Sequence, residues 1–495
     1  MIEERRGSVV ITRMLRKLKS KTDRMSPAAK ASIVLMATQM IQKGLSLITS
    51  PIYTRLLSTA EYGEVSLFFS WYEIFVIFTG LCLSKGVFNN GMIDYKYDRD
   101  SFTLSMYSLT FISTLIIGTV VTIFCSFIYN FLKLPTNLIL YMFLLLAFEA
   151  ALSQWTVRNR FEYKYKATAI VTVLIAVISP ICGILGIYLF PTDKVIARII
   201  GARNIFLIAY IAVLVYLVYK ARGRIKTAYW KYALKFNLPL IPHYLSLHVL
   251  NHMDRIMIAS IVDNAAAGIY SVAYNGAAIV KMVWTSINAS LIPWTYEKCE
   301  KQDYKRLADL TRVLIFGYGL ICITFMFLAP EMMKILAPSS YHEGIYVIPS
   351  VIAGVFFSSL YYIFANVVYY YKKPKFVMIA SVTSAVANVI LNAVFIPIFG
   401  YLAAGYTTMV SYIIQVIIDY WAMKKIVKQD IYDMRFILVM SIGVVAIGIG
   451  LSFLYKFTAI RLILFALFLC YSAFYLRKNM SILKTFFSKK KGQKT

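Results

Sequence analysis

The stretch IYVIPSVIAGVFFSSLYYIFANVVYY, residues 345–370, decides the fold. It contains no charged side chain, and a helix needs about 20 mostly apolar residues to cross the hydrocarbon core of a bilayer. The rest of the chain has a similar composition: of 495 residues, 60% are hydrophobic and 15% are charged, whereas soluble domains carry about 25% charged residues. The sequence therefore predicts a membrane protein that crosses the bilayer many times, and it excludes both a soluble and a disordered chain.

Apolar runs of about this length recur along the chain with short connections between them. We place fourteen such spans at 31–53, 63–85, 103–129, 136–157, 167–190, 195–219, 236–261, 266–293, 312–336, 345–370, 376–396, 402–423, 434–454 and 459–477. The connections leave no room for a domain outside the membrane. The predicted fold class is therefore an all-α polytopic membrane protein with about fourteen transmembrane helices.

The basic residues orient these spans. The formal net charge is +29, and lysine and arginine gather in the even-numbered connections and in two basic tails, at 1–30 and 478–495. The odd-numbered connections and their flanks hold only Arg55, Lys133, Lys194, Lys334, Lys456 and Arg461. Basic residues accumulate in cytoplasmic loops, so we expect both termini in the cytoplasm. The same rule explains the excess of positive charge without a nucleic-acid partner.

A short sequence repeat suggests two related halves. Residues 60–66 read AEYGEVS and residues 265–271 read AAAGIYS, at an offset of 205 residues. Six predicted spans separate the copies, so both halves would enter the membrane in the same direction. We therefore predict two six-helix lobes, at 31–219 and 236–423, related by a pseudo-twofold axis along the membrane normal, with two further helices at 434–477.

Three motifs resemble those of bacterial polysaccharide transporters, the Wzx-type flippases of O-antigen. They are PIYTRLLSTAEYG at 51–63, Asp254-Arg255 followed by GIYSVAY at 268–274, and a late motif with NVILN at 388–392 and AAG at 403–405. The likeness covers about 31–423. It implies membership of the multidrug, oligosaccharidyl-lipid and polysaccharide exporter superfamily and an alternating-access transporter of lipid-linked sugars.

Ionisable residues inside the spans are the informative ones, because each costs about 2.5–3.5 kcal/mol at the middle of a helix that faces lipid. They are Lys43, Glu73, Glu149, Arg203, Asp254, Arg255 and Lys281. Such groups must pair, reach the interface or line water. Several alternatives stay open: Asp254 and Arg255 could form a structural bridge between helices, Glu73 or Glu149 could be a buried neutral acid, and Arg55 could simply reach the membrane surface.

The resemblance suggests how these residues and their neighbours could bind a lipid-linked sugar and a coupling ion. A lipid pyrophosphate would meet basic side chains in a hydrated cavity through charge-assisted hydrogen bonds; these candidates are Lys43, Arg55, Arg255, Lys281, His248 and His252. Aromatic side chains could contact the sugars; these candidates are Trp71, Tyr72, Tyr274 and Trp284. Carboxylates could bind the H⁺ or Na⁺ that drives transport; these candidates are Glu73, Glu149 and Asp254.

No metal or catalytic group is predicted. His243, His248 and His252 share one span, but metal sites usually recruit carboxylates or thiolates as well. The sequence holds no GxSxG motif and no phosphate-binding nucleotide loop, so we expect no enzyme activity and no cofactor other than a coupling ion.

The predicted function is a flippase that moves an undecaprenyl-diphosphate-linked oligosaccharide across the bacterial cytoplasmic membrane. The expected partners are that lipid-linked sugar, the membrane, and polymerase or glycosyltransferase proteins. A multidrug or peptidoglycan-precursor exporter of the same superfamily is the alternative, although a drug exporter would favour an acidic cavity. A membrane polysaccharide polymerase or ligase is the alternative from another class.

Overall fold

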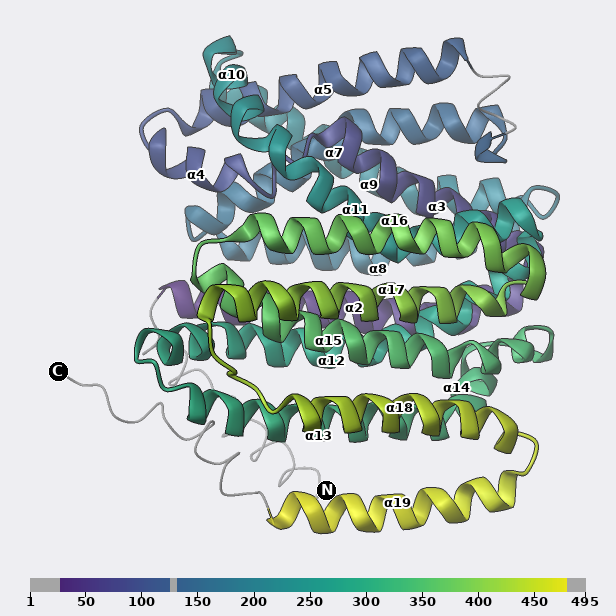
Figure 1. Cartoon of the computed structure of the whole chain (residues 1–495). Coiled ribbons are helices and arrows are strands. Elements are labelled where there is room, and N and C mark those ends of the chain that lie inside the picture. The colour runs from purple at the N-terminus through teal and green to yellow at the C-terminus, as the bar shows by residue number, and fades with distance from the viewer. Residues whose placement is uncertain (1–26, 125–130, 479–495) are drawn as a thin grey trace, which may run out of the picture. The chain divides into compact units, whose positions relative to one another are not determined.

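The computed structural model describes residues 27–124 and 131–478 (Figure 1). The described residues form seventeen α-helices and two short 3₁₀ helices, and no β-strand occurs among them. The predicted basic tails at 1–30 and 478–495 lie, apart from their inner ends, outside the described residues.

Fourteen of the described helices have at least 21 residues, and each overlaps one of the fourteen predicted spans. They are α2 (Pro27–Leu56), α3 (Thr59–Gly80), α5 (Arg99–Ile123), α7 (Thr136–Phe161), α8 (Tyr165–Leu189), α9 (Lys194–Ala221), α11 (Ile241–Ile261), α12 (Asn264–Glu300), α13 (Tyr304–Phe327), α15 (Ile348–Tyr370), α16 (Pro374–Phe399), α17 (Leu402–Val427), α18 (Met434–Leu454) and α19 (Thr458–Lys478). The all-α polytopic fold class is confirmed.

The short helices lie in the connections between the long ones. They are α4 (Val87–Asp94), α10 (Thr227–Asn237), α14 (Ala329–Leu336), and the 3₁₀ helices η1 (Leu238–Leu240) and η2 (Ser339–Tyr346). The span predicted at 236–261 begins only at Ile241, because proline lacks a backbone N–H and favours a helix start. Pro242 accordingly occupies the first turn of α11.

The long helices differ in how apolar they are. In the described residues nine are long and apolar enough to cross a membrane by composition alone. Helices α2, α3, α11, α12 and α19 fall outside that set, and the first four carry most of the polar and charged residues that the sequence analysis selects. In a membrane protein, polar helices of this kind must direct those side chains toward protein or water.

The chain divides into two compact units. Unit 1 contains the described residues up to Thr49, Phe78–Ile123 and Ile139–Pro239, and unit 2 contains Ser50–Ile77, the described part of Phe124–Leu138, and the residues from Leu240 onward. Each unit is described by itself. The predicted lobes at 31–219 and 236–423, with the helices at 434–477, stay a prediction.

Unit 1 is built on a tight pair of helices, α8 and α9. A Cβ atom added to Gly186 would lie 2.6 Å from the carbonyl oxygen of Ala197, and one added to Gly201 would lie 2.6 Å from that of Cys182. The two glycines therefore let the backbones touch, as small residues do between membrane helices.

Unit 2 is built around α15, almost all of which is buried. It packs against α12, α17 and α18 (Figure 1). Gly354 lies against the backbone of Met409, and a Cβ added to Gly405 would lie 2.2 Å from the hydroxyl oxygen of Ser350. Gly405 belongs to the AAG motif, so this part of the motif serves the packing of α17 on α15.

The two repeat glycines contact each other's helices within unit 2. A Cβ added to Gly63 would lie 1.7 Å from the carbonyl oxygen of Asn264, and one added to Gly268 would lie 2.1 Å from that of Thr59. The contact is reciprocal and joins positions that share the 205-residue offset. Equivalent residues meet in this way where a local twofold relation exists between two copies.

The helices that carry these glycines are both capped at equivalent positions. The backbone N–H of Glu61 donates to the Ser58 hydroxyl over 3.2 Å, and the N–H of Ser58 donates to the Glu61 carboxylate over 2.7 Å. The Asp263 carboxylate accepts from the N–H of Ala266 over 2.7 Å. Ser58 and Asp263 again differ by 205 residues, so the sequence repeat coincides with two helix starts stabilised by side-chain caps.

We expect Gly63→Ala and Gly268→Ala each to destabilise the protein by about 2 kcal/mol or more, because the methyl group would overlap a carbonyl oxygen that cannot move alone. The measurement is thermal unfolding of the purified chain in nanodiscs. Gly317→Ala is the matched control, because a Cβ there meets nothing within 4 Å. Equal unfolding temperatures for all three variants would contradict the constraint.

Candidate functional site

The candidate site lies on α11, the helix in which the sequence analysis aligns two histidines with an arginine. His248, His252 and Arg255 follow one another at intervals of four and three residues and therefore share one face of the helix. Helix α11 packs against α12, α16 and α17. Side chains from those helices complete its polar environment.

Arg255 and Lys281 are held close together by one asparagine. The Lys281 ammonium donates to the side-chain oxygen of Asn251 over 2.8 Å, and the Arg255 guanidinium donates to the backbone carbonyl of Asn251 over 3.0 Å. Arg255 also donates to the side-chain oxygen of Asn275 over 3.3 Å and lies over the ring of Tyr274, 4.6 Å from its centroid. Two predicted cations thus meet at a hydrogen-bonded junction of α11 and α12.

The two histidines lie beside this junction. The rings of His248 and His252 are nearly parallel, with centroids 6.0 Å apart, and the charges of Arg255 and Lys281 both act on His252. We call Arg255, Lys281, His248 and His252 the cationic cluster. It contains four of the six residues that the sequence analysis assigns to a cationic cavity.

The other two predicted cations lie elsewhere. Arg55 is exposed at the end of α2 and donates to the carbonyl of Pro51 over 2.8 Å and, more weakly, to that of Ile335 at the end of α14. These contacts tie Arg55 to the ends of α2 and α14, and both its binding role and the alternative that it reaches the membrane surface stay predictions. Lys43 is exposed and belongs to unit 1, so its part in a shared cavity stays a prediction.

Asp254 points away from the cluster into a cage of neutral donors. The hydroxyls of Tyr270 and Thr408 each donate to one carboxylate oxygen over 2.6 Å, and the amides of Asn388 and Asn392 donate to the other over 3.3 and 2.8 Å. The Asp254 side chain is buried. Four hydrogen bonds from three other helices therefore stabilise the buried carboxylate, and none of these four donors is an arginine or a lysine.

Two donors of this cage belong to a motif that the sequence analysis quotes without assigning it to the site. Asn388 and Asn392 begin and end the NVILN stretch of α16, one helical turn apart, so both reach Asp254. Their own oxygens are also engaged: Thr407 donates to Asn392, and Asn392 donates to Asn388 over 3.3 Å. Paired asparagines at this spacing in an apolar run are the signal that could have placed them.

A second buried acid was missed by the sequence analysis. Asp419 in α17 is fully buried, and Gln415 lies one turn before it with an exposed fraction of 1%. Neither side chain has a hydrogen-bond partner in the described part of the chain. Their spacing of four residues inside a predicted span is the signal that could have found them.

The remaining predicted residues are placed as follows. Glu149 lies half-buried in α7 of unit 1. The four aromatic candidates for sugar contact, Trp71, Tyr72, Tyr274 and Trp284, are all buried. Trp71 donates to the carbonyl of Leu132 over 3.2 Å, and Trp284 packs on Tyr318. Contact of these rings with a sugar would need another conformation, and that role stays a prediction.

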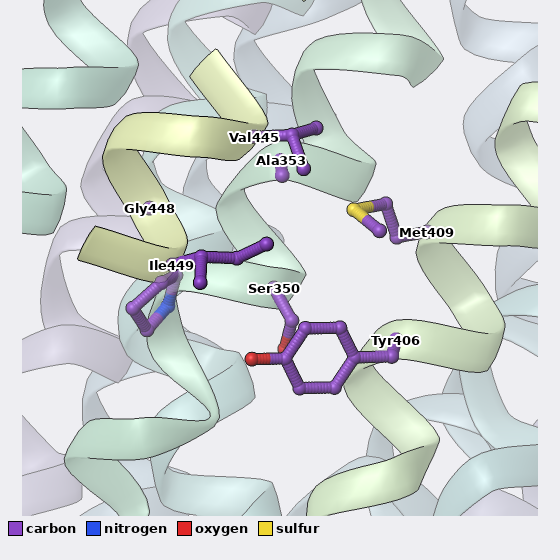
Figure 2. A pocket seen from close by; sticks show the side chains of 8 residues that line it. Ser350, Ala353, Tyr406, Met409, Val445, Gly448 and Ile449 are labelled. Atoms are coloured by element: carbon purple, nitrogen blue, oxygen red, sulfur yellow. The ribbon is translucent and has the colours of Figure 1, made fainter. Parts of the chain in front are cut away.

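A small pocket in unit 2 lies between α15, α17 and α18 (Figure 2). Figure 2 shows Ser350, Tyr406 and Met409 on its wall with Val445 and Ile449. The Ser350 hydroxyl donates to the carbonyl of Val347, and no lining residue carries a charge. A pocket of this chemistry does not suit a phosphate group.

Comparisons with known proteins agree on one family and one fold. The sequence profile of a family described as "Polysaccharide biosynthesis protein" matches residues 28–297. An uncharacterized membrane protein of Haemophilus influenzae is 26% identical over 369 residues, which is 72% of this chain and 87% of that protein.

Two groups of solved transporters have similar folds. The lipid II flippase MurJ in an inward closed conformation matches with a TM-score of 0.64 at 14% identity, over 91% of this chain and 99% of that one. An inward-facing multidrug resistance transporter of the MATE family, in the MOP superfamily, matches with a TM-score of 0.58 at 15% identity, over 80% and 98%. At these identities the likeness shows the fold alone.

The Asp254 cage predicts a strong coupling between its members. We expect Asn392→Leu to cost about 1–3 kcal/mol, because one carboxylate oxygen keeps only the longer bond from Asn388. Removing both partners, in Asp254→Leu with Asn392→Leu, should cost less than the sum of the single changes. Thermal unfolding of the four proteins measures this difference.

Asn366→Leu provides the control for that cycle. Asn366 is also a buried asparagine of unit 2, but it donates to Asn288, which is not among the residues that donate to Asp254. Its cost should add to that of Asp254→Leu. Additive costs for Asn392→Leu as well would mean that the cage does not act as one unit.

Proposed function

The chain belongs to the polysaccharide biosynthesis protein family, and from this premise we propose that it is a flippase for a lipid-linked oligosaccharide. The substrate is an undecaprenyl-diphosphate-linked repeat unit of O-antigen, capsule or exopolysaccharide. Alternating access carries it from the cytoplasmic to the outer leaflet of the bacterial cytoplasmic membrane, in which the chain lies with both termini in the cytoplasm. No covalent bond is made or broken.

The observation that carries the proposal is the cationic cluster. Arg255 and Lys281 lie on helices long enough to cross the bilayer, where an unpaired cation is costly. Their hydrogen-bond partners in the described part of the chain are the neutral oxygens of Asn251 and Asn275. Both cations therefore keep charge available for an anion. A diphosphate is the anion that the substrate class supplies, and arginine and lysine bind its oxygens through charge-assisted hydrogen bonds.

The charge of the cluster favours this substrate over the alternatives. An exporter of cationic drugs would gain from acidic side chains, whereas the charges of Arg255 and Lys281 repel a cationic drug. A peptidoglycan precursor has the same diphosphate chemistry, so the sugar and not the anchor would separate it from the proposed substrate.

Coupling to an ion is the second part of the proposal. Asp254 lies next to Arg255 in sequence, and its carboxylate is surrounded by oxygen- and nitrogen-bearing side chains of α12, α16 and α17. Binding of H⁺ or Na⁺ would change the charge of this cage and bias the packing of α11 against those helices. Glu73 and Glu149 are the other proposed coupling carboxylates.

We expect Arg255→Ala and Lys281→Ala each to lower flipping of a lipid-linked oligosaccharide by about tenfold or more, because each removes a charged hydrogen bond to the diphosphate. The assay measures transfer between leaflets in proteoliposomes, with Lys456→Ala, an exposed lysine between α18 and α19, as the control. Unchanged flipping in both cluster variants would refute the proposal.

The same proteoliposomes separate the competing functions. Efflux of cationic compounds would indicate a drug exporter, and lengthening of the glycan would indicate a polymerase or ligase. In cells, removal of the gene should cause the lipid-linked glycan to accumulate on the cytoplasmic side. Identification of that glycan defines the sugar that is carried.

We expect wild-type flipping to accelerate when a pH or Na⁺ gradient is imposed, and Asp254→Asn to abolish the acceleration, because the amide cannot exchange a proton or balance a cation. Asp430→Asn, which changes an exposed carboxylate, should keep the acceleration. Equal wild-type rates with and without gradients would reject coupling. Loss of acceleration in Glu73→Gln or Glu149→Gln, with Asp254→Asn unaffected, would move the coupling role to that residue.

A further inference from the structure

Glu73 of α3 and two histidines of α11 converge within unit 2. Each of Glu73, His248 and His252 offers one possible metal-ligand atom, and these three atoms all lie within 4.8 Å of one another. The sequence analysis counted the histidines of a single span and found no carboxylate with them. The fold supplies that carboxylate from a helix far away in the sequence.

One distance in this group approaches the spacing of ligand atoms around a bound ion. Ligand atoms that surround a tetrahedral Zn²⁺ at 2.0–2.1 Å lie about 3.4 Å apart. A carboxylate oxygen of Glu73 is already 3.6 Å from Nδ1 of His248. The His248 and His252 rings are inclined by 18° with centroids 6.0 Å apart. The His252 nitrogen lies within 4.8 Å of the other two ligand atoms, so metal binding requires its side chain to move closer to them.

Two of the three side chains are partly exposed in the structure. The Glu73 side chain is 41% exposed and that of His248 is 18% exposed. The ligands come from two separate helices, α3 and α11, so an ion bound by them would join two elements that are far apart in the sequence.

We propose that Glu73, His248 and His252 bind a divalent transition-metal ion of the Zn²⁺ class. Imidazole nitrogen suits Zn²⁺, Fe²⁺, Ni²⁺ and Cu²⁺, whereas Mg²⁺ and Ca²⁺ favour ligand sets made of oxygen. Two imidazoles and one carboxylate form a three-ligand set, which leaves a coordination position open to water or an anion. This site goes beyond the proposed flippase activity and does not depend on it.

The neighbouring cations set the expected strength of binding. Arg255 and Lys281 act electrostatically on His252 and oppose a further positive charge, while the Glu73 carboxylate attracts it. We therefore expect a site that binds one ion per chain but is weaker than a closed structural site with four protein ligands.

The test uses the full chain, purified in nanodiscs and treated with a chelator. Zn²⁺ binding is measured by equilibrium dialysis, and Co²⁺ is used as a spectroscopic probe because its visible absorption reports the ligand geometry. We expect one ion per wild-type chain. Glu73→Gln, His248→Ala and His252→Ala should each lower the affinity by about tenfold or more, because each deletes one of three ligands.

The chain supplies its own matched controls, since it holds four histidines. His243 contacts the Ser381 hydroxyl and His342 contacts the carbonyl of Ala337, and neither belongs to the group. His243→Gln and His342→Gln should keep wild-type affinity. Zn²⁺ should also raise the unfolding temperature of the wild type and of both controls, but not of the three ligand variants.

Two outcomes would overturn the proposal. Wild-type protein that binds no more Zn²⁺ than His252→Ala would exclude the site, and an equal loss in the two control variants would assign the ion to scattered histidines. Unfolding temperatures without metal identify any ligand variant that is simply misfolded. Because metal binding is measured without a substrate, its failure is distinct from a failure of the flippase proposal.

Discussion

The close approach of α3 and α12 at Gly63 and Gly268 is the constraint on which the candidate site depends. Each glycine faces a backbone carbonyl of the other helix, at distances that leave no room for a Cβ atom. Glu73 lies ten residues beyond Gly63, and His252 lies nine residues before the end of α11, the helix that precedes α12. At about 1.5 Å per residue, Glu73 lies roughly 15 Å along α3 from Gly63, and His252 lies at a similar distance along α11 from its end. The glycine contact therefore brings a carboxylate to the histidines.

Beyond this contact, helix α11 keeps two neighbouring charges of opposite sign in separate environments. The Asp254 carboxylate receives four hydrogen bonds from neutral side chains, whereas Arg255, the next residue, turns to Asn251, Asn275 and the face of Tyr274. Adjacent residues on a helix point about 100° apart, so one helix can serve two environments. A buried carboxylate and a cation kept apart in this way can each respond to a ligand of opposite charge. That separation supports both the diphosphate and the coupling parts of the proposed function.

Much of the fold could be predicted because the bilayer imposes it. A helix is the element that satisfies every backbone hydrogen bond within one segment, so each apolar run of spanning length became a long helix. The exceptions have local causes. The span predicted at 236–261 starts at Ile241, after η1 and the prolines around it. The repeat at 60–66 and 265–271 was also visible in the sequence, but the contact between its two glycines was not, because a repeat defines equivalence and not proximity.

The sequence by itself determined which side chains are costly in a membrane and must therefore find partners, among them Asp254, Arg255, Lys281 and the histidines of α11. Only the tertiary structure decided which residues are those partners. Asn388 and Asn392 donate hydrogen bonds to Asp254. Glu73 contacts His248, and Arg55 donates to a carbonyl at the end of α14. The physical reason is that insertion cost depends on one residue and its depth, whereas hydrogen bonds and ligand sets depend on distances between helices. Those distances are set by packing contacts such as that between Gly63 and Asn264.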